Sequence, residues 1–467
     1  MPERLTARQV LALVTDPGSF GDLPDPARDS RPDGPLGWQG YDDSRARAAA
    51  RTGERESVVC GTASVAGTRA VLLAFEFGFL GGSLGERTGD RLEAAYTYAR
   101  AHRLPVVPLV ATGGSRMQEG MLALTQLQRV ARQSALTREA GLPQVAVARD
   151  PTTGGGWATL GAGADVVLAL PGAQVGFAGS RVRPPDADPA AYTAEAQVAA
   201  GSVDAVVEPS AVREVLGSWL RLLTGGTPPD GGPVVPAQVP AALGATALPG
   251  TGWEAVRRAR SPHRPRCLAY LDAYFAHRAG ISGDRCGGTD PVGMLCGFGE
   301  RDGRTVAYAA QTGAATRPAG YRTAARLIRL ADRLGTPVLT LVDTPGAAND
   351  AEAERQGAGP AIAEVFGAVA AARVPVTTLV IGEGGSGGAL ALAAPGNTWA
   401  TPDSYFSVIA PELAAAILKR GPGEVEATAG QLRLRPQDLV ELGVVRGIVT
   451  RGGPAQDADR PGPVVPG

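Results

Sequence analysis

The stretch Pro105–Gly114 reads PVVPLVATGG, and Pro337–Gly346, 232 positions further along the chain (337 minus 105), reads PVLTLVDTPG. Six of these ten positions carry the same residue. The same offset, with no gap, also places Gly155-Gly156 on Gly387-Gly388. Such a shared register is typical of an internal repeat, and each copy ends a strand-like run in a glycine-rich loop. The sequence therefore predicts two copies of one domain.

The remaining sequence fits two α/β domains. Strand-like and helix-like runs alternate in both halves, which predicts parallel sheets, and SVVCGTASV and TRAVLLAFEF are joined by a hairpin-type turn at Ala66-Gly67. Residues 226–250 are rich in Pro and Gly with almost no charge, which predicts a linker. The predicted organisation is an N-terminal domain over residues 1–225, a C-terminal domain over 251–453 and a disordered tail over 454–467.

Bulk composition argues against several classes of function. A net charge of −1 over 467 residues disfavours nucleic-acid and anionic-membrane partners. No apolar run approaches the roughly 20 residues of a membrane span, and the N-terminal MPERLTARQVLALV lacks the features of a signal peptide, so a cytoplasmic location is expected. The four cysteines include no Cys-x-x-Cys pair, which argues against a zinc site and predicts reduced, structural thiols.

The scarcity of two side chains narrows the chemistry. Lys419 is the single lysine and lies in the helix-like segment AAAILKRG, which disfavours Schiff-base catalysis. The three histidines, His102, His263 and His277, lie away from the glycine-rich loops. An imidazole general base is therefore disfavoured but not excluded, because residues distant in sequence can be neighbours in space.

The glycine-rich loops are the strongest candidates for a functional site. In DPTTGGG (150–156) and GEGGSGG (382–388), glycines let backbone N–H groups face a ligand, and the helix start that comes next adds a positive dipole end. Such a loop suits a phosphate or a developing oxyanion, whereas the alternative is a tight turn that binds nothing. The first loop has neither the spacing of a dinucleotide-binding fingerprint nor the lysine of a P-loop.

Three neighbouring features have competing interpretations. Ser386 lies in a loop that superficially resembles the nucleophile elbow of serine hydrolases, but no histidine follows His277 to complete that machinery. Arg116 and Glu119 lie one helical turn apart just after a strand. They either bind a ligand or form an ion pair that caps the start of a helix. The segment FLGGSLG (79–85) is a third glycine loop, which packs on a ligand or on a helix.

Several motifs, in order along nearly the whole chain, resemble the carboxyltransferase of acetyl-CoA carboxylase. The N-terminal half resembles its β subunit in GGSLGERTGDRL, GGSRMQEG, DPTTGGG and VGFAGSRV. The C-terminal half resembles its α subunit in PAGYRTAARLIRLADRLGTPV, DTPGA, GEGGSGGAL and SVIAPE. The chain thus resembles a β–α fusion from the biotin-dependent carboxylase family. This resemblance implies an α/β fold of two tandem crotonase-like ββα spiral domains, in agreement with the repeat.

The resemblance also implies a reaction, in which a carboxyl group moves from carboxybiotin on a separate carrier protein to acetyl-CoA and gives malonyl-CoA. Two backbone oxyanion holes would hold the enolate and ureido anions, so no His or Lys base would be required. The implied catalytic residues are Gly154 and Gly155 in one hole and Gly387 and Gly388 in the other, with the choice of adjacent amides open by one residue. The implied substrate-binding residues are Gly113, Gly114, Arg116, Gly384, Gly385 and Arg322.

The same resemblance implies the partners. A biotin carboxyl carrier protein would be a separate chain, because Lys419 lies between Leu418 and Arg420 and offers no biotinylation site. The biotin carboxylase subunit would be another chain, because the sequence has no ATP-binding loop. The active site would form between halves of different protomers, which implies a homo-oligomer of at least two chains. No metal is expected, since the zinc ribbon of many bacterial β subunits is absent. Thr323 stands where the family usually has a lysine.

Three alternatives stay open at this stage. One is a carboxylase of another acyl-CoA, such as propionyl-CoA, because the acyl pocket is not readable from the sequence. Another is a decarboxylase of a malonyl thioester, which would use the same oxyanion holes. The last is a non-catalytic partner of a carboxylase, which the glycines kept in both loops disfavour.

Overall fold

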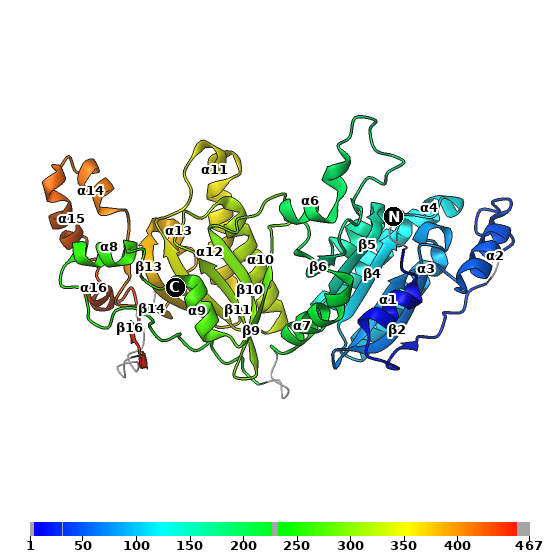
Figure 1. Cartoon of the computed structure of the whole chain (residues 1–467), viewed down its shortest axis with the longest axis horizontal. Coiled ribbons are helices and arrows are strands. Elements are labelled where there is room, and N and C mark those ends of the chain that lie inside the picture. Colours follow the sequence, from blue (N-terminus) through cyan, green and yellow to red (C-terminus); the bar gives the residue numbers. More distant parts are fainter. Residues whose placement is uncertain (1–3, 30, 227–231, 455–467) are drawn as a thin grey trace. The chain divides into compact units, whose positions relative to one another are not determined.

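The computed structural model describes residues 4–29, 31–226 and 232–454, and the chain divides into two compact units. The first unit comprises Met1–Thr224 and Arg285–Gly287, and the second comprises Gly225–Asp284 and Gly288–Gly467. Each unit is built on one sheet with helices packed against it (Figure 1). The tail predicted for residues 454–467 lies, apart from Pro454, outside the described residues.

The sheet of the first unit follows the order β1-β2-β3-β4-β5-β6-β8, with β7 paired to β5. Strands β2 and β3 are antiparallel, whereas the pairs from β3 through β6 are parallel. The strands are β1 (Gly21–Asp22), β2 (Val58–Val65), β3 (Thr68–Phe75), β4 (Val106–Thr112), β5 (Val145–Thr153), β6 (Val166–Ala169), β7 (Val175–Gly176) and β8 (Ala205–Val206). The α-helices are α1 (Ala7–Val14), α2 (Tyr41–Thr52), α3 (Glu86–Ala101), α4 (Gly120–Glu139), α5 (Gly154–Gly156), α6 (Ala194–Ala199) and α7 (Val212–Thr224).

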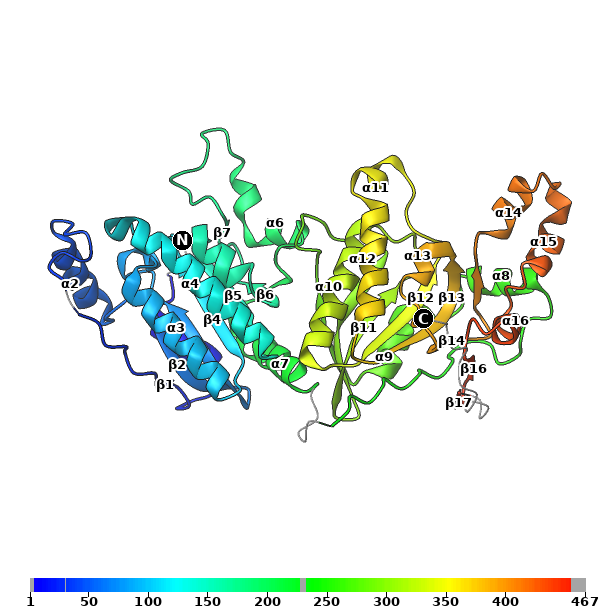
Figure 2. The ribbon, with the colours of Figure 1, turned by 180° about the vertical axis from the view of Figure 1, so that it is seen from behind.

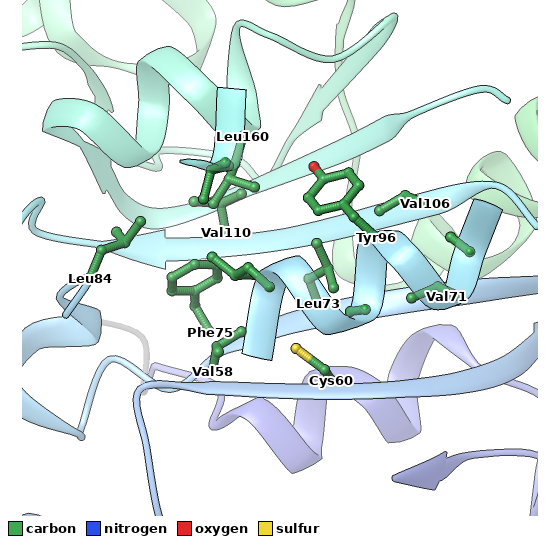
Figure 3. Packing of buried hydrophobic residues seen from close by; sticks show 14 of the residues in the cluster. Val58, Cys60, Val71, Leu73, Phe75, Leu84, Tyr96, Val106, Val110 and Leu160 are labelled. Atoms are coloured by element: carbon green, nitrogen blue, oxygen red, sulfur yellow. The ribbon is translucent and has the colours of Figure 1, made fainter. Parts of the chain in front are cut away.

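The core of the first unit depends on the two-residue period of its strands. Val71, Leu73 and Phe75 of β3 point to one face of the sheet and pack with Leu92 and Tyr96 of α3 (Figure 3). The residues between them on β3 are also fully buried, because α1 and α7 pack against β3 as well. Figure 2 shows α3 and α4 crossing one face of this sheet. A sheet covered on both faces explains why its strands read as continuous apolar runs.

The sheet of the second unit follows the order β17-β16-β14-β13-β12-β11-β10-β9, with β15 paired to β13. The strands are β9 (His277–Ile281), β10 (Met294–Arg301), β11 (Arg304–Gln311), β12 (Val338–Thr344), β13 (Val376–Gly385), β14 (Thr398–Ala400), β15 (Tyr405–Ser407), β16 (Gly447–Thr450) and β17 (Gly453–Pro454). The α-helices are α8 (Gly252–Arg260), α9 (Cys267–Tyr274), α10 (Pro318–Leu334), α11 (Ala351–Arg355), α12 (Ala358–Ala371), α13 (Ser386–Leu390), α14 (Pro411–Ile417), α15 (Val425–Gln431) and α16 (Pro436–Glu441).

Equivalent hairpins open both sheets. Ala66 and Gly67, with φ of +44° and +83°, form the two-residue turn between β2 and β3, which confirms the predicted hairpin. Asp302 and Gly303, with φ of +50° and +73°, form the same turn between β10 and β11. Positive φ at both central residues defines the mirror-image turn that matches the twist of antiparallel strands. The repeat therefore extends upstream of the stretches that first indicated it.

The predicted repeat is confirmed where the parallel strands meet. Strand β4 ends at Thr112 and β12 ends at Thr344, so the offset of 232 (344 minus 112) is kept. In both units the ladder to the next strand shifts register at this point, between Val110 and Thr112 and between Val342 and Thr344. A shift of this kind bends a strand and redirects the chain beyond it. The two glycine-rich loops therefore leave their sheets in the same way.

The segment predicted as a linker packs onto the second unit where it is described, over residues 232–250. Ala237 and Ala242 are buried, and the carbonyl of Ala237 accepts a hydrogen bond from Thr377 Oγ1 at 2.9 Å. The carbonyl of Gln238 accepts a hydrogen bond from Tyr274 Oη at 2.9 Å. Residues 227–231, which belong to the same predicted linker, lie outside the described residues. The predicted domain boundaries remain a proposal.

Candidate active site

The first glycine-rich loop lies where β5 runs into α5, and the π-helical turn η3 (Trp157–Gly161) comes directly after it. Gly154 has a φ of +64°, a conformation that favours glycine. A Cβ on Gly154 would lie only 3.2 Å from the Cα of Gly114, which follows β4. The structure thus brings Gly113-Gly114 and Gly154 together, backbone against backbone.

The backbone donors of this loop differ in availability. The N–H of Gly154 donates to the carbonyl of Phe177 at 2.9 Å, so it is already satisfied within the chain. Gly155 and Gly156 lie in the first turn of α5, where amides have no carbonyl one turn earlier in the helix. The preceding Thr153 makes no side-chain capping bond to them. The geometry therefore favours the amides of Gly155 and Gly156, one residue later than the predicted pair.

The second glycine-rich loop lies where β13 runs into α13. A Cβ on Gly384 would lie 1.8 Å from Phe406 Cδ2, and one on Gly385 would lie 2.0 Å from the carbonyl oxygen of Pro345. These two glycines therefore allow close packing, and the geometry argues against the predicted role of Gly384 and Gly385 in direct substrate contact. Gly387 differs, because a Cβ there would meet no atom within 4 Å.

Two side chains hold the peptide between Gly388 and Ala389 in place. Its carbonyl oxygen accepts a hydrogen bond from Tyr321 Oη at 3.0 Å and one from Gln311 Nε2 at 3.1 Å. A Cβ on Gly388 would lie 2.5 Å from the backbone nitrogen of Ala347. The first turn of α13 is therefore anchored on one side and open over Gly387. Gly387 and Gly388 lie in the first turn of α13, where amides have no carbonyl one turn earlier in the helix and Gly385 adds no side-chain cap.

Ser386 occupies the position that corresponds to Gly154 in the repeat, and its φ of +57° matches. A serine with positive φ between a strand and a helix has the backbone geometry of a nucleophile elbow. No hydrogen bond joins Ser386 to a histidine among the residues that the structure describes. His277 lies on β9, four strands away from β13 in the sheet. The serine hydrolase interpretation therefore gains no support.

A buried carboxylate supports the second loop, and the sequence interpretation missed it. Asp343 is fully buried and accepts hydrogen bonds from Arg264 Nη2 at 2.5 Å, from Arg266 Nη1 at 3.2 Å and from the N–H of Glu383 at 3.2 Å. Glu383 in turn accepts a hydrogen bond from Arg260 Nε at 2.8 Å. The sequence did contain a sign of this carboxylate, because Asp343 stands at the position of the repeat where the first copy has the apolar Ala111.

Arg116 lies at the centre of a buried polar network rather than on an open surface. Its Nη2 donates to Glu56 Oε1 at 2.5 Å, and its Nη1 donates to Tyr41 Oη at 3.1 Å. Its Nε donates to Ser83 Oγ at 3.2 Å. The side chain is 0% exposed. Nη1 also lies 3.5 Å from Glu119, so the predicted ion pair between Arg116 and Glu119 is confirmed.

This network contradicts a direct contact between Arg116 and a substrate. Burial alone would raise the pKa of Glu56, but the charge and hydrogen bonds of Arg116 outweigh burial and lower that pKa to about 2. The guanidinium therefore lies against a carboxylate that stays ionised and has no face open to a ligand. Arg116 follows Gly114 in the chain, and its N–H donates to the carbonyl of Leu84 at 2.9 Å. We assign Arg116 to positioning this loop.

Arg322 is more accessible than Arg116. It lies in the first turns of α10, with a side chain that is 19% exposed. Its Nε donates to Asp284 Oδ2 at 2.7 Å and its Nη1 donates to the carbonyl of Gln356 at 3.0 Å. Arg322 therefore remains a candidate for substrate contact, although its charge is already shared with a carboxylate.

Exposed apolar side chains flank both loops. Met117 is 78% exposed and Phe177, whose carbonyl holds Gly154, is 73% exposed. In the second unit Leu390, at the end of α13, and Val408, just after β15, are 47% and 72% exposed. Exposed apolar side chains that gather beside polar backbone groups are typical of a surface that another molecule covers.

Comparisons with known proteins give consistent results. Residues 3–206 match the family model described as carboxyl transferase domain, and residues 248–461 match the model described as acetyl co-enzyme A carboxylase carboxyltransferase-like. The chain is 42% identical to acetyl-coenzyme A carboxylase carboxyl transferase subunits beta/alpha of Salinispora arenicola (strain CNS-205), with 99% of this chain and 85% of the relative covered. The protein of the same name from Saccharopolyspora erythraea is 38% identical, with 91% of this chain and 78% of the relative covered.

Solved structures share the fold. The structure of transcarboxylase 12S with hydrolysed methylmalonyl-coenzyme A bound superposes with a TM-score of 0.77 at 21% identity, over 96% of this chain and 87% of that chain. A single-chain, multi-domain long-chain acyl-CoA carboxylase gives a TM-score of 0.71 at 21% identity, over 96% of this chain and 46% of that chain. In the described part of the chain no helix is long and apolar enough to cross a membrane. Those same residues contain no group of three or more His, Cys, Asp or Glu side chains placed to hold a metal ion.

Replacing Glu56 by Gln is expected to destabilise the first unit by about 3 kcal/mol, because it removes the nearest carboxylate of the buried Arg116 and leaves only Glu119 at 3.5 Å. Urea unfolding monitored by circular dichroism at pH 7 measures this loss. Since the pKa of Glu56 is lowered from 4.5 to about 2, its stabilising effect is complete above pH 4.5. The difference between wild type and variant should therefore shrink as the pH falls from 4.5 towards 2.

The matched control is Asp22→Asn, which removes an exposed ion pair with Arg8 at 3.0 Å. This change should cost less than about 1 kcal/mol. Equal losses in the two variants would show that the network around Arg116 does not hold the first unit together.

Proposed function

The chain belongs to the family of acetyl-coenzyme A carboxylase carboxyl transferase subunits beta/alpha, and on that premise we propose that it transfers a carboxyl group from carboxybiotin to acetyl-CoA. Its two tandem units have the crotonase-like α/β fold of biotin-dependent acyl-CoA carboxyltransferases, as the sequence predicted. Acetyl-CoA is the proposed acceptor because the relatives with 42% and 38% identity carry that substrate in their names.

The duplicated loop is the observation that supports this chemistry. Carboxybiotin, when bound, would supply the carboxyl group, and its ureido nitrogen would take the proton that the α-carbon of acetyl-CoA loses. Negative charge then develops on the acceptor thioester and on the ureido oxygen, and each charge needs fixed donors. Gly155 and Gly156 would serve one oxygen, and Gly387 and Gly388 the other. Each donor contributes about 3–4 kcal/mol of transition-state stabilisation in comparable sites.

The second loop suits the flat ureido group. The space in front of Gly387, which a Cβ would fill, admits a ligand close to the backbone. Tyr321 and Gln311 bind the carbonyl of Gly388 and so fix the Gly388–Ala389 peptide, directly after the proposed donors, which limits reorganisation of this helix start during the reaction. No titrating side chain is required in either loop, which agrees with the single lysine and three histidines of the chain.

The same function implies the proposed partners. A biotin carboxyl carrier protein would present the biotin, and a separate biotin carboxylase subunit would load it. A homo-oligomer of at least two chains is proposed, and the exposed apolar residues beside both loops supply the surface for it. The transcarboxylase 12S structure of similar fold is described as a hexamer assembly.

The function is tested by running the reaction backwards on the purified full-length protein with malonyl-CoA and biocytin. We expect acetyl-CoA to form only when biocytin is present, because the leaving carboxyl group needs an acceptor. Acetyl-CoA formed without biocytin would indicate a decarboxylase instead. Faster transfer from methylmalonyl-CoA would make a longer acyl-CoA the substrate, and no product in any arm would overturn the enzymatic proposal.

The role of the second loop is tested by Gly387→Leu. The Cβ of the new side chain would meet no atom of the chain within 4 Å, and the side chain would occupy the space in front of the loop, so transfer should fall at least about 100-fold while the unfolding midpoint stays unchanged. Gly367→Leu is the matched control, since Gly367 is exposed on α12 and a Cβ there also meets no atom within 4 Å.

Wild-type turnover in Gly387→Leu would remove this loop from the proposed mechanism. Gly155 is a poorer test position, because a Cβ on it would lie 2.2 Å from Leu127 Cδ1 and folding would suffer together with activity.

A further inference from the structure

The first unit contains a cavity that the reaction proposed above does not use. It has a volume of about 240 Å³ and lies beside the start of α3. Four arginines line it from separate segments, since Arg28 and Arg31 precede α2, Arg45 lies on α2 and Arg87 lies on α3. We call it the arginine cavity.

Two of these arginines have no ion pair among the described residues, and Arg45 shares its carboxylate with Arg116. Arg31 and Arg87 form neither an ion pair nor a side-chain hydrogen bond with any residue that the structure describes. Arg45 lies 4.0 Å from Glu56, a carboxylate already bound to Arg116, and its Nε is buried without a hydrogen-bond partner among the described residues. A buried donor without a partner is costly, so its presence points to a ligand that would satisfy it.

The carboxylates of the arginine cavity do not cancel this charge. Asp29, Glu86 and Glu119 line it, which leaves a net charge of +1 against four arginines. Glu86 is paired with Arg28 at 3.2 Å, and Glu119 is paired with Arg116, which does not line the arginine cavity, at 3.5 Å. The arginine cavity therefore favours an anion.

The size and the donor type indicate which anion. Guanidinium groups match the geometry of phosphate oxygens and bind them through paired hydrogen bonds. Ligand sites for whole drug-sized molecules measure about 300–1,000 Å³. A cavity of about 240 Å³ suits one phosphate group with part of its sugar rather than a complete nucleotide. A phosphate monoester is the chemistry that fits best.

The arginine cavity lies close to the first glycine-rich loop. Its wall at Glu86 is two residues from Leu84, and the N–H of Leu84 donates to the carbonyl of Gly114 at 2.9 Å. Two residues span at most about 7 Å, and Gly114 contacts Gly154. One ligand with a flexible connection between its reacting group and its phosphate can therefore reach both the loop and the arginine cavity.

We propose that the arginine cavity binds the 3′-phosphate of the acyl-CoA while the thioester lies at the Gly155-Gly156 amides. This inference rests on the proposed function, and it gives the chain a phosphate site in place of the buried Arg116. The acyl-CoA then has two separated anchors, one for the reacting carbonyl and one for the nucleotide end. Affinity for CoA depends on Arg31, Arg45 and Arg87, whereas turnover depends on the amides.

The test compares binding of CoA and 3′-dephospho-CoA to the full-length protein by isothermal titration calorimetry. Wild type should bind CoA about tenfold or more tightly than 3′-dephospho-CoA, since charge-assisted hydrogen bonds to the phosphate are lost. The double variant Arg31→Ala/Arg87→Ala should bind both compounds equally, at the affinity of wild type for 3′-dephospho-CoA. The double variant Arg31→Lys/Arg87→Lys should keep part of the preference, because it keeps charge without the paired donors.

The control is Arg47→Ala/Arg55→Ala, which removes two exposed arginines of the same region that do not line the arginine cavity and should keep the full preference. An unchanged preference in Arg31→Ala/Arg87→Ala would overturn the proposal. A second outcome would also overturn it. If inorganic phosphate raises the unfolding midpoint of wild type but not of this variant, and the variant still prefers CoA, the arginine cavity holds free phosphate and not the 3′-phosphate of CoA. Since binding is measured without turnover, a preference for CoA without carboxyl transfer would contradict the proposed function and leave this site standing.

Discussion

In each unit the backbone that leaves one parallel strand packs directly on the backbone that leaves the next. A Cβ on Gly154 would lie 3.2 Å from the Cα of Gly114, and one on Gly385 would lie 2.0 Å from the carbonyl of Pro345. This close approach excludes side chains and places a helix start at the carboxyl edge of the sheet. Helix-start amides at that edge are the donors on which the proposed chemistry depends.

The two copies hold this geometry with different supports. In the first unit the chain after Gly114 is held by Arg116, which lies in a buried network with Glu56. In the second unit the loop is held by Asp343, which accepts a hydrogen bond from the N–H of Glu383, and by Tyr321, which donates to the carbonyl of Gly388. The repeat thus keeps the backbone arrangement and not the residues around it. Ser386 illustrates this, since it adopts the positive φ that glycine has at position 154.

The periodicity of the sequence was sufficient to predict the main architecture of the two units. The repeat, the hairpin at Ala66-Gly67 and the parallel strands after it were predicted because each depends on local pattern and turn residues. Helix α3 begins at Glu86, although Gly89 weakens the local helix signal in its first turns. Gly89 is there for packing, as a Cβ on it would lie 2.1 Å from Gln126 Oε1 of α4.

The site was less predictable because its contacts join distant residues. The burial of Arg116 depends on Glu56, 60 residues earlier, and the arginine cavity depends on Arg31, Arg45 and Arg87 meeting in space. No local pattern reveals such pairs. The glycine loops were visible in the sequence, whereas the division of their glycines into packing positions and open positions required coordinates, as for Gly385 and Gly387.

The most direct test of paired amide cradles is a crystal structure of the protein with biocytin and a non-hydrolysable acetyl-CoA analogue. The account predicts the ureido oxygen about 2.7–3.1 Å from the amides of Gly387 and Gly388, and the carbonyl oxygen of the analogue at the same distance from those of Gly155 and Gly156. Either oxygen bound instead by an ionisable side chain, with the loop amides turned away, would contradict the account.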